Sequence, residues 1–326
     1  MSQAQRDALD GMLREGPLDL GGDVLEQRPI FEQMMAATPL PDDVTTTSGT
    51  LGDIPVVTID VEGIDDNGTV ILYFHGGAFA IGTAASSVGL ASNLGRHARA
   101  RVISVDYRLA PEHPYPAALE DAMAAYRALL DGDYAPSQVA IAGESAGAGL
   151  AAATLVALKT AALPQPAAAL LMSPWDDLTL SGTSMNAKAA LDPALTPEGL
   201  RRRVADYAGD ADSADALISP VFADLAGLPP LLIQAGSHEI LLDDATRLAA
   251  HAAAADVEVT LDVTPGVPHV FQAFAGMLDE ADAALARAGA FLSAHFAARH
   301  EGGVRPCNGL STSSAAGGIR VAVPLT

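Results

Sequence analysis

Gly143-Glu144-Ser145-Ala146-Gly147 is the stretch on which the prediction of the fold depends. It fits the pattern G-x-S-x-G, in which a serine stands on a sharp turn between a strand and a helix. The apolar run 139–142 precedes the turn, and the Ala- and Leu-rich segment 148–155 follows it. Glycines on both sides of the serine remove the Cβ atoms that such a turn cannot accommodate. The serine hydroxyl is then expected at a helix N-terminus, where backbone N–H groups favour negative charge.

The pentapeptide has a second interpretation, in which Ser145 only caps the helix that follows it. With 30 glycines among 326 residues, a single match to so short a pattern carries little weight by itself. The choice between a nucleophile and a helix cap therefore depends on the rest of the chain.

Apolar segments of strand type alternate with segments of helix type on both sides of this turn. We expect strands at residues 44–47, 56–61, 70–74, 102–105, 139–142, 168–172, 231–235 and 257–263. We expect helices at residues 86–97, 117–130, 148–158, 244–255 and 281–298. This alternation predicts an α/β fold, in which helices cover both faces of a mostly parallel central sheet. Right-handed crossovers then place the loops that follow the strands along one edge, where sites form in open α/β sheets.

Two segments depart from this alternation, and both are candidates for a cap over a pocket. Residues 1–40 mix acidic and apolar positions, and their apolar positions at helical spacing are Ile30, Phe31, Met34 and Met35. This pattern is as typical of an amphipathic helix on the core as of a cap with adaptable methionine lining. Residues 181–215 contain scattered Asp, Pro and Gly, and an insertion at this point is expected to lie over the sheet.

The body of the protein is then expected to comprise residues 41–180 and 216–300. Residues 301–326 are rich in Gly and Ser, and we expect them to form a disordered tail. The single cysteine, Cys307, lies in this segment, so no intrachain disulfide can form. The N-terminus shows no apolar core of a signal peptide, and no run of 18 apolar residues occurs, so we expect a soluble cytoplasmic protein.

The chain is strongly acidic, with 40 acidic against 18 basic residues and a formal net charge of −22. Binding to nucleic acid needs a basic footprint, and binding to an anionic membrane surface needs basic residues as well. The composition therefore argues against both partners and indicates a well hydrated surface. The eight histidines show no zinc-type spacing, so no metal is expected.

His75-Gly76-Gly77-Ala78 follows the apolar run 70–74 and lies well upstream of Ser145. Glycines let the backbone approach a substrate and direct N–H groups at a developing oxyanion. We therefore predict an oxyanion hole formed by the N–H groups of Gly76, Gly77 and Ala146. The plainer interpretation is a glycine turn at the end of a strand.

A nucleophilic serine needs a base, and His269 is the best placed of the histidines downstream of it. His269 follows the strand 257–263 in a loop that also contains Pro265 and Pro268. A catalytic imidazole belongs on a positioned loop at the edge of the sheet. By contrast, His251 lies inside a predicted helix, and His295 and His300 lie in or after the last helix.

The base needs a carboxylate that fixes its tautomer and orientation. Glu239 and Asp243 both follow the strand 231–235 and qualify by position. Asp243 and Asp244 also have a sufficient structural role, because acidic residues are favourable in the first turn of a helix. We therefore prefer Glu239. The order along the chain is serine, acid and histidine, as in α/β hydrolases.

Taken together, these motifs resemble the hormone-sensitive-lipase-like family of α/β hydrolases, which is the bacterial esterase family IV. The residues that carry the resemblance are His75-Gly76-Gly77, residues 106–112, Tyr115-Pro116-Ala117-Ala118, Gly143–Gly147, Ser173-Pro174-Trp175 and Pro268-His269. The spacing of Glu239, Leu241 and Asp243 is also similar to that around the family's catalytic acid. Two positions depart from the family pattern: Ala78 replaces a third glycine, and Glu239 stands where aspartate is more frequent.

The resemblance implies an α/β-hydrolase fold with a helical cap and an activity on short-chain carboxylic esters that needs no cofactor. Ser145, Glu239 and His269 are then the catalytic residues. Three apolar residues are expected to contact the substrate, namely Phe79, Met34 and Val270. Glu144 matches an acidic position of the motif and either steadies the site or belongs to a structural network near Arg108.

The leading hypothesis is a serine carboxylesterase, and the alternative within the same chemistry is a lactone hydrolase. A hormone receptor that resembles the family, as in plants, lacks the catalytic histidine, whereas this chain has His269. A true lipase favours a large exposed apolar lid, and an acidic surface offers no obvious help. The expected partner is a small ester. The oligomeric state, including a homodimer, stays open.

Overall fold

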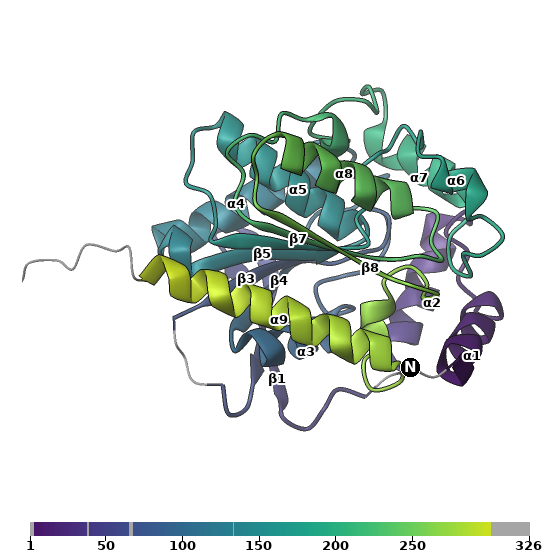
Figure 1. Cartoon of the computed structure of the whole chain (residues 1–326), viewed down its shortest axis with the longest axis horizontal. Helices are drawn as coiled ribbons and strands as arrows, with labels where there is room; N and C mark the ends of the chain where they lie inside the picture. The colour runs from purple at the N-terminus through teal and green to yellow at the C-terminus, as the bar shows by residue number, and fades with distance from the viewer. Residues whose placement is uncertain (1–2, 38, 65–67, 133, 301–326) are drawn as a thin grey trace, which may run out of the picture.

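The computed structural model describes residues 3–37, 39–64, 68–132 and 134–300 (Figure 1). The predicted tail, residues 301–326 with Cys307, lies outside the described residues. Within the described part of the chain, none of the helices combines the length and apolar character that a membrane span requires.

The centre of the molecule is a sheet of eight strands in the order β1-β2-β4-β3-β5-β6-β7-β8. The strands are β1 (Val44–Leu51), β2 (Ile54–Val61), β3 (Val70–Phe74), β4 (Arg101–Val105), β5 (Val139–Glu144), β6 (Ala168–Met172), β7 (Leu231–Gly236) and β8 (Val259–Thr264). β2 pairs antiparallel with β1 and with β4, and the strands from β4 to β8 are parallel. The predicted α/β fold with a mostly parallel sheet is confirmed.

The central strands are apolar because they are covered on both faces. Every residue of β3, β5, β6 and β7 is buried, which is why these strands read as continuous apolar runs and not as alternating patterns. β1 lies at the edge, and its Thr- and Ser-rich sequence is mostly exposed.

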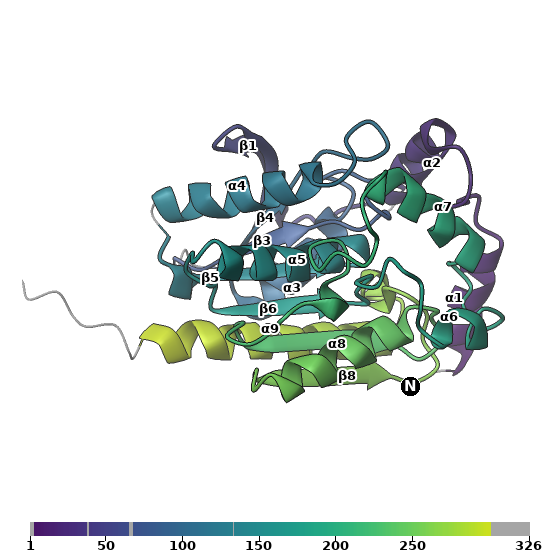
Figure 2. The same cartoon turned by 90° about the horizontal axis from the view of Figure 1, so that it is seen from above.

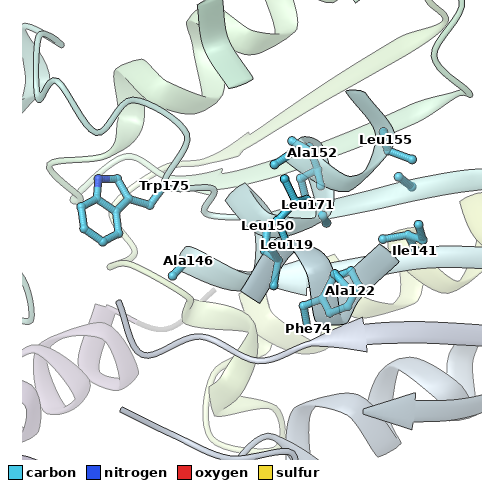
Figure 3. Close-up of a cluster of buried hydrophobic side chains, with 14 of the residues drawn as sticks. Phe74, Leu119, Ala122, Ile141, Ala146, Leu150, Ala152, Leu155, Leu171 and Trp175 are labelled. Atoms are coloured by element: carbon cyan, nitrogen blue, oxygen red, sulfur yellow. The ribbon is translucent and has the colours of Figure 1, made fainter. Parts of the chain in front are cut away.

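Helices form a layer on each side of this sheet, as Figure 1 shows. One layer contains α4 (Ala117–Asp131), α5 (Ala146–Thr160) and α8 (Leu242–Ala254), and the other contains α3 (Val88–Ala98) and α9 (Asp279–His300). Three short 3-10 helices are η1 (Pro136–Gln138), η2 (Pro220–Phe222) and η3 (Phe271–Phe274). Figure 3 shows part of the core on the α5 side, where Leu150 and Leu155 lie with Ile141 and Leu171 of the sheet. This packing buries α5 almost completely, so the turn that precedes it has a rigid foundation.

The remaining four helices come from the two segments that interrupt the alternation. They are α1 (Gln3–Arg14), α2 (Val24–Ala36), α6 (Ser184–Ala187) and α7 (Pro197–Ala208). Figure 2 shows them together at one end of the molecule, the end toward which the arrows of β6 and β8 point. The loops that follow the parallel strands lie at this end, so these helices, which we call the cap helices, lie beside the candidate site.

The N-terminal segment differs from the expected pattern. Two helices form, and α1 had no counterpart in the predicted elements. In α2 the buried residues are Val24 and Gln27, whereas Met35 is 37% exposed. The face of α2 that packs on the molecule is therefore not the one that carries Met35.

Candidate active site

Ser145 occupies the single position between the end of β5 and the start of α5, with φ 55° and ψ −122°. A Cβ atom on Gly143 would lie 2.3 Å from the Gly147 carbonyl oxygen, and one on Gly147 would lie 2.1 Å from that of Phe74. Two residues further along α5, a Cβ atom on Gly149 would lie 2.0 Å from the Trp175 carbonyl oxygen. Glycine is required at all three positions because each faces backbone that cannot move away.

The serine hydroxyl faces an imidazole and makes no capping hydrogen bond to its helix. Ser145 Oγ lies 2.9 Å from His269 Nε2, and His269 Nδ1 lies 2.6 Å from Glu239 Oε2. Glu239 is fully buried and His269 is 8% exposed. The structure thus brings the three predicted catalytic residues into one continuous chain of hydrogen-bond contacts.

Glu239 lies in the connection between β7 and α8, where its second carboxylate oxygen accepts the N–H of Gly236 at 2.9 Å. Asp243, the other candidate, lies in the first turn of α8. Its carboxylate accepts the N–H of Ser184, at the start of α6, at 3.0 Å. The two carboxylates therefore serve different partners, and only that of Glu239 contacts His269.

The loop of His269 is held at several points. His238 donates its N–H to the Val267 carbonyl oxygen at 3.0 Å, and Gly266 donates its N–H to Ser237 Oγ at 2.8 Å. Val270 adopts a left-handed conformation with φ 49° and donates its N–H to Ser173 Oγ at 3.0 Å. These contacts place the imidazole at the end of the sheet, opposite the turn of Ser145.

In the loop after β3, the predicted role of Gly76 as an oxyanion donor does not agree with the structure. The N–H of Gly76 donates a 2.8 Å hydrogen bond to Glu144 Oε1, so it is not directed at a substrate. Gly77 has φ +115°, and a Cβ atom there would lie 2.1 Å from the Ile81 carbonyl oxygen. Among the described residues, no protein acceptor contacts the N–H groups of Gly77, Ala78 or Ala146. These three are the donors that remain available.

Glu144 is the buried centre of the network behind this loop. Besides the N–H of Gly76, its carboxylate accepts the hydroxyl of Ser87 at 2.6 Å and that of Tyr73. Burial raises the pKa of Glu144 to about 7. Glu144 thus belongs to a structural network, as one of the two interpretations predicted, but Arg108 takes no part in it, because that side chain pairs with the Asp121 carboxylate at 2.8 Å.

His75 fixes the same loop from its other side, a role that the motif alone did not reveal. Its ring is fully buried and stacks on Tyr107 with 4.2 Å between the ring centroids. Burial lowers the pKa of His75 to about 4, so the ring is neutral near pH 7. Nδ1 lies 2.7 Å from the Gly76 carbonyl oxygen, and because a carbonyl can only accept, Nδ1 carries the proton.

The three predicted substrate contacts have different surroundings. Phe79 is 2% exposed, and its ring stacks on Tyr207 of α7 with 3.8 Å between the centroids. Met34 is half-buried on α2, and Val270 is half-buried next to His269. Residues 75–81, which follow β3, are named the oxyanion loop for the role proposed for them below. Tyr207, which the sequence did not single out, connects this loop to α7 through its contact with Phe79. Contact of these side chains with a substrate stays a prediction.

Metal ligands do not gather at this site. In residues 3–37, 39–64, 68–132 and 134–300, no group of three or more His, Cys, Asp and Glu side chains is arranged to hold a metal ion.

Comparison with known proteins agrees with this geometry. A model of the family described as alpha/beta hydrolase fold matches residues 71–273. An acetyl-hydrolase of Streptomyces hygroscopicus is 46% identical over 226 residues, which cover 69% of this chain and 76% of that protein. The carboxylesterase NlhH of Mycobacterium tuberculosis is 36% identical over 250 residues, which cover 73% of this chain and 77% of that protein.

Solved structures show the same relationship in three dimensions. An esterase from the bacterial hormone-sensitive lipase family superposes with a TM-score of 0.87 at 41% identity, covering 91% of this chain and 99% of that one. EstE5, in a crystal soaked with p-nitrophenyl butyrate, superposes with a TM-score of 0.86 at 37% identity, covering 91% of this chain and 100% of that one.

The matched family model and the arrangement of strands define an alpha/beta hydrolase. Within that class, the chain belongs to the bacterial hormone-sensitive lipase family of carboxylic ester hydrolases. The resemblance predicted from the motifs is confirmed.

Proposed function

We propose that this enzyme is a serine carboxylesterase that hydrolyses short-chain carboxylic esters through an acyl-enzyme. The observation that carries the proposal is the continuous contact from Glu239 through His269 to Ser145, at 2.6 Å and 2.9 Å. A nucleophile, a base in contact with it and a carboxylate that orients the base are the parts that acyl transfer to serine requires.

In the first half of the reaction, Ser145 Oγ attacks the ester carbonyl while His269 Nε2 takes its proton. The buried Glu239 carboxylate holds the proton on His269 Nδ1 and stabilises the imidazolium that forms. The negative oxygen of the tetrahedral intermediate accepts the N–H groups of Gly77, Ala78 and Ala146. His269 then gives its proton to the leaving alcohol, and the acyl group stays on Ser145.

In the second half, water attacks the acyl-enzyme while His269 takes one of its protons. The tetrahedral intermediate uses the same backbone donors and collapses to release the acid, and the proton returns to Ser145 Oγ. In this scheme Ala78 takes the place that the sequence assigned to Gly76, because the N–H of Gly76 already donates to Glu144.

The preference for short acyl chains rests on the relatives. One is named an acetyl-hydrolase, and the crystal of another was soaked with a butyrate ester.

The test is a hydrolysis screen of p-nitrophenyl esters of increasing acyl length, together with lactones, for the wild type and for Ser145→Ala. We expect kcat to be highest with the shortest acyl groups and to fall by at least about 10³-fold in Ser145→Ala. An organophosphate should label the wild type once, at Ser145. Ser48→Ala is the matched control, since Ser48 lies exposed in the edge strand β1, and it should keep wild-type activity.

Two results would contradict the proposal. One is full activity in Ser145→Ala, and the other is organophosphate labelling at a different serine. Faster turnover of lactones than of every linear ester would leave the triad in place and change the substrate class.

A further inference from the structure

The connection that carries Glu239 is in direct contact with the cap. We call residues 237–241, between β7 and α8, the acid loop. The N–H of Ile240 donates to Asp192 Oδ2 at 2.8 Å, and the carbonyl oxygen of Ile240 accepts the Ser184 hydroxyl at 2.7 Å. The residue that follows Glu239 is therefore bound through its own N–H and its own C=O by two side chains from the insertion 181–215.

Both of these side chains are buried and already fixed by other contacts. Asp192 is 4% exposed, and its Oδ1 accepts the N–H groups of Ala194 and Leu195, each at 2.9 Å. A carboxylate that accepts three N–H groups in a buried position has a defined orientation. Asp192 therefore presents Oδ2 to Ile240 from a rigid turn.

Ser184 is held with the same precision. It is 4% exposed, and its hydroxyl accepts the N–H of Asp243 at 2.9 Å while it donates to Ile240. In return, the N–H of Ser184 donates to Asp243 Oδ2 at 3.0 Å. This reciprocal pair joins the start of α6 to the start of α8, immediately after the acid loop.

The position of the Glu239 backbone matters because its carboxylate makes two exacting contacts. Oε1 accepts the N–H of Gly236 at 2.9 Å, and Oε2 lies 2.6 Å from His269 Nδ1. Before Glu239 the chain is held by β7 and by the hydrogen bond from His238 to Val267. After Glu239 it is held by Asp192 and Ser184. A shift of about 1 Å in a catalytic group can lower the rate by about 10²-fold.

We propose that Asp192 and Ser184 are positioning residues of the catalytic triad. Through Ile240 they set the place of the Glu239 carboxylate, so the insertion supports catalysis directly in addition to covering the site. This inference rests on the proposed function, because it takes Glu239 to act on His269 during ester hydrolysis.

The experiment measures kcat and KM for p-nitrophenyl acetate in Asp192→Asn and Ser184→Ala, each in the wild-type and in the Glu239→Gln background. Asparagine keeps the shape of aspartate, but its NH₂ group must then face an N–H donor, so one of the contacts is lost. In the wild-type background we expect kcat to fall by about 10-fold in each variant, with KM changed by less than about 3-fold. In the Glu239→Gln background the same changes should lower kcat by less than about 2-fold, because the carboxylate that Asp192 and Ser184 position is already absent.

Asp212→Asn is the matched control. Asp212 lies exposed in the same insertion, and its Oδ1 accepts the N–H of Ala214 in a local turn, so wild-type kinetics are expected. Circular dichroism and thermal unfolding accompany every variant. If Asp192→Asn does not fold, Ser184→Ala, which removes one hydroxyl, decides the matter alone.

The outcomes separate this inference from the proposed function. If the wild type shows no esterase activity, or Ser145→Ala keeps it, the proposed function fails and the inference fails with it. If the wild type is active and Glu239→Gln is impaired, while Ser184→Ala and a folded Asp192→Asn keep wild-type kcat, the inference alone is overturned. It is also overturned if the losses in kcat are equal in both backgrounds, since the two residues would then act independently of Glu239.

Discussion

Ser145 is held by the body of the molecule, whereas Glu239 and His269 lie on loops that the cap helices contact. The loop after β3 is held from both sides, by Glu144 of the body and by Tyr207 of α7. Ser145 joins a buried strand to a buried helix, and the loop of Gly76 is anchored on Glu144. By contrast, Leu9 of α1 packs in one cluster with Val267 and Phe271, which flank His269. Glu239 is followed directly by Ile240, which the insertion binds from both sides.

This difference separates two kinds of structural requirement. The proposed nucleophile, Ser145, takes its place when the sheet and its helices pack, so its geometry depends on the stability of the body. The loops of the proposed base and acid, His269 and Glu239, are in addition held by contacts from α1 and from the insertion. We therefore expect damage to the body to lower stability and activity together, and damage to the cap to lower activity while the sheet stays folded.

The largest effect on kcat is expected at Glu239, and Asp243 provides the comparison, because only the Glu239 carboxylate contacts His269. Glu239→Gln keeps the shape of the side chain but favours the wrong tautomer of His269, which by analogy with the serine proteases can lower kcat by about 10⁴-fold. Asp243→Asn weakens the contact with Ser184 and the charge in the first turn of α8, and should lower stability by about 0.5–1 kcal/mol. Kinetics and thermal unfolding of both variants provide the measurement. An inactive Asp243→Asn beside an active Glu239→Gln would reverse the two assignments.

A smaller loss is expected at Glu144, on the side that the body holds. Glu144→Ala removes the acceptor of the Gly76 N–H and the anchor of the oxyanion loop, so kcat should fall by about 10²-fold together with a lower melting temperature. Glu144→Gln keeps an acceptor oxygen and should retain most of the activity. An active and fully stable Glu144→Ala would show that the loop has another support.

The pH dependence of stability offers a second test at the same residue. Because the pKa of Glu144 is raised from 4.5 to about 7, the native state binds more protons than the unfolded state between these values. The contribution of Glu144 to the free energy of unfolding therefore falls as pH rises from 4.5 to 7, and Glu144→Gln lacks this fall. The difference in unfolding free energy, wild type minus Glu144→Gln, should decrease by about 3 kcal/mol over this range. Chemical denaturation at pH 4.5 and pH 7 measures it, and an unchanged difference would contradict the raised pKa.

The smallest loss in kcat is expected from the cap at the N-terminus. Deletion of residues 1–35 removes α1 and most of α2, and should lower kcat by about 10-fold and change the selectivity for acyl length more than it damages the sheet. Leu9→Ala narrows the test to the cluster beside His269, and Met12→Ala is its control, because Leu9 is 4% exposed and Met12 is 46% exposed. Unchanged kinetics with every acyl length after the deletion would show that the segment has no part in the site.

The sequence predicted best those elements whose burial is complete. The boundaries of β3 and β6 agree with the expected strands to the residue, because a polar residue, His75 or Ser173, directly follows each apolar run. His269 and Glu239 could be singled out because the order of the motifs along the chain limits the candidates. Asp243 was the weaker candidate for the acid because its place in the first turn of α8 already gives it a structural role.

What the sequence could not predict depends on partners far away along the chain. The direction of the Gly76 N–H is set by the Glu144 carboxylate, which lies 68 residues further on. α1 has a single buried residue, Leu9, whose partners belong to the last third of the chain, so the local sequence does not show what the helix packs against. The contacts of Asp192 and Ser184 with Ile240 also join segments that no local pattern connects.

The three crowded glycines around Ser145 bear on how this enzyme can change by mutation. At Gly143, Gly147 and Gly149 even one added methyl group would meet a carbonyl oxygen of another backbone segment at 2.0–2.3 Å. In a library of random variants these three positions should tolerate no replacement, so neither natural drift nor laboratory selection can adjust the turn of Ser145 through its glycines. Variation in selectivity can instead enter through the side chains that the cap brings to Glu239, His269 and Phe79. An engineer who wants a different esterase from this scaffold should mutate the cap and leave the turn alone.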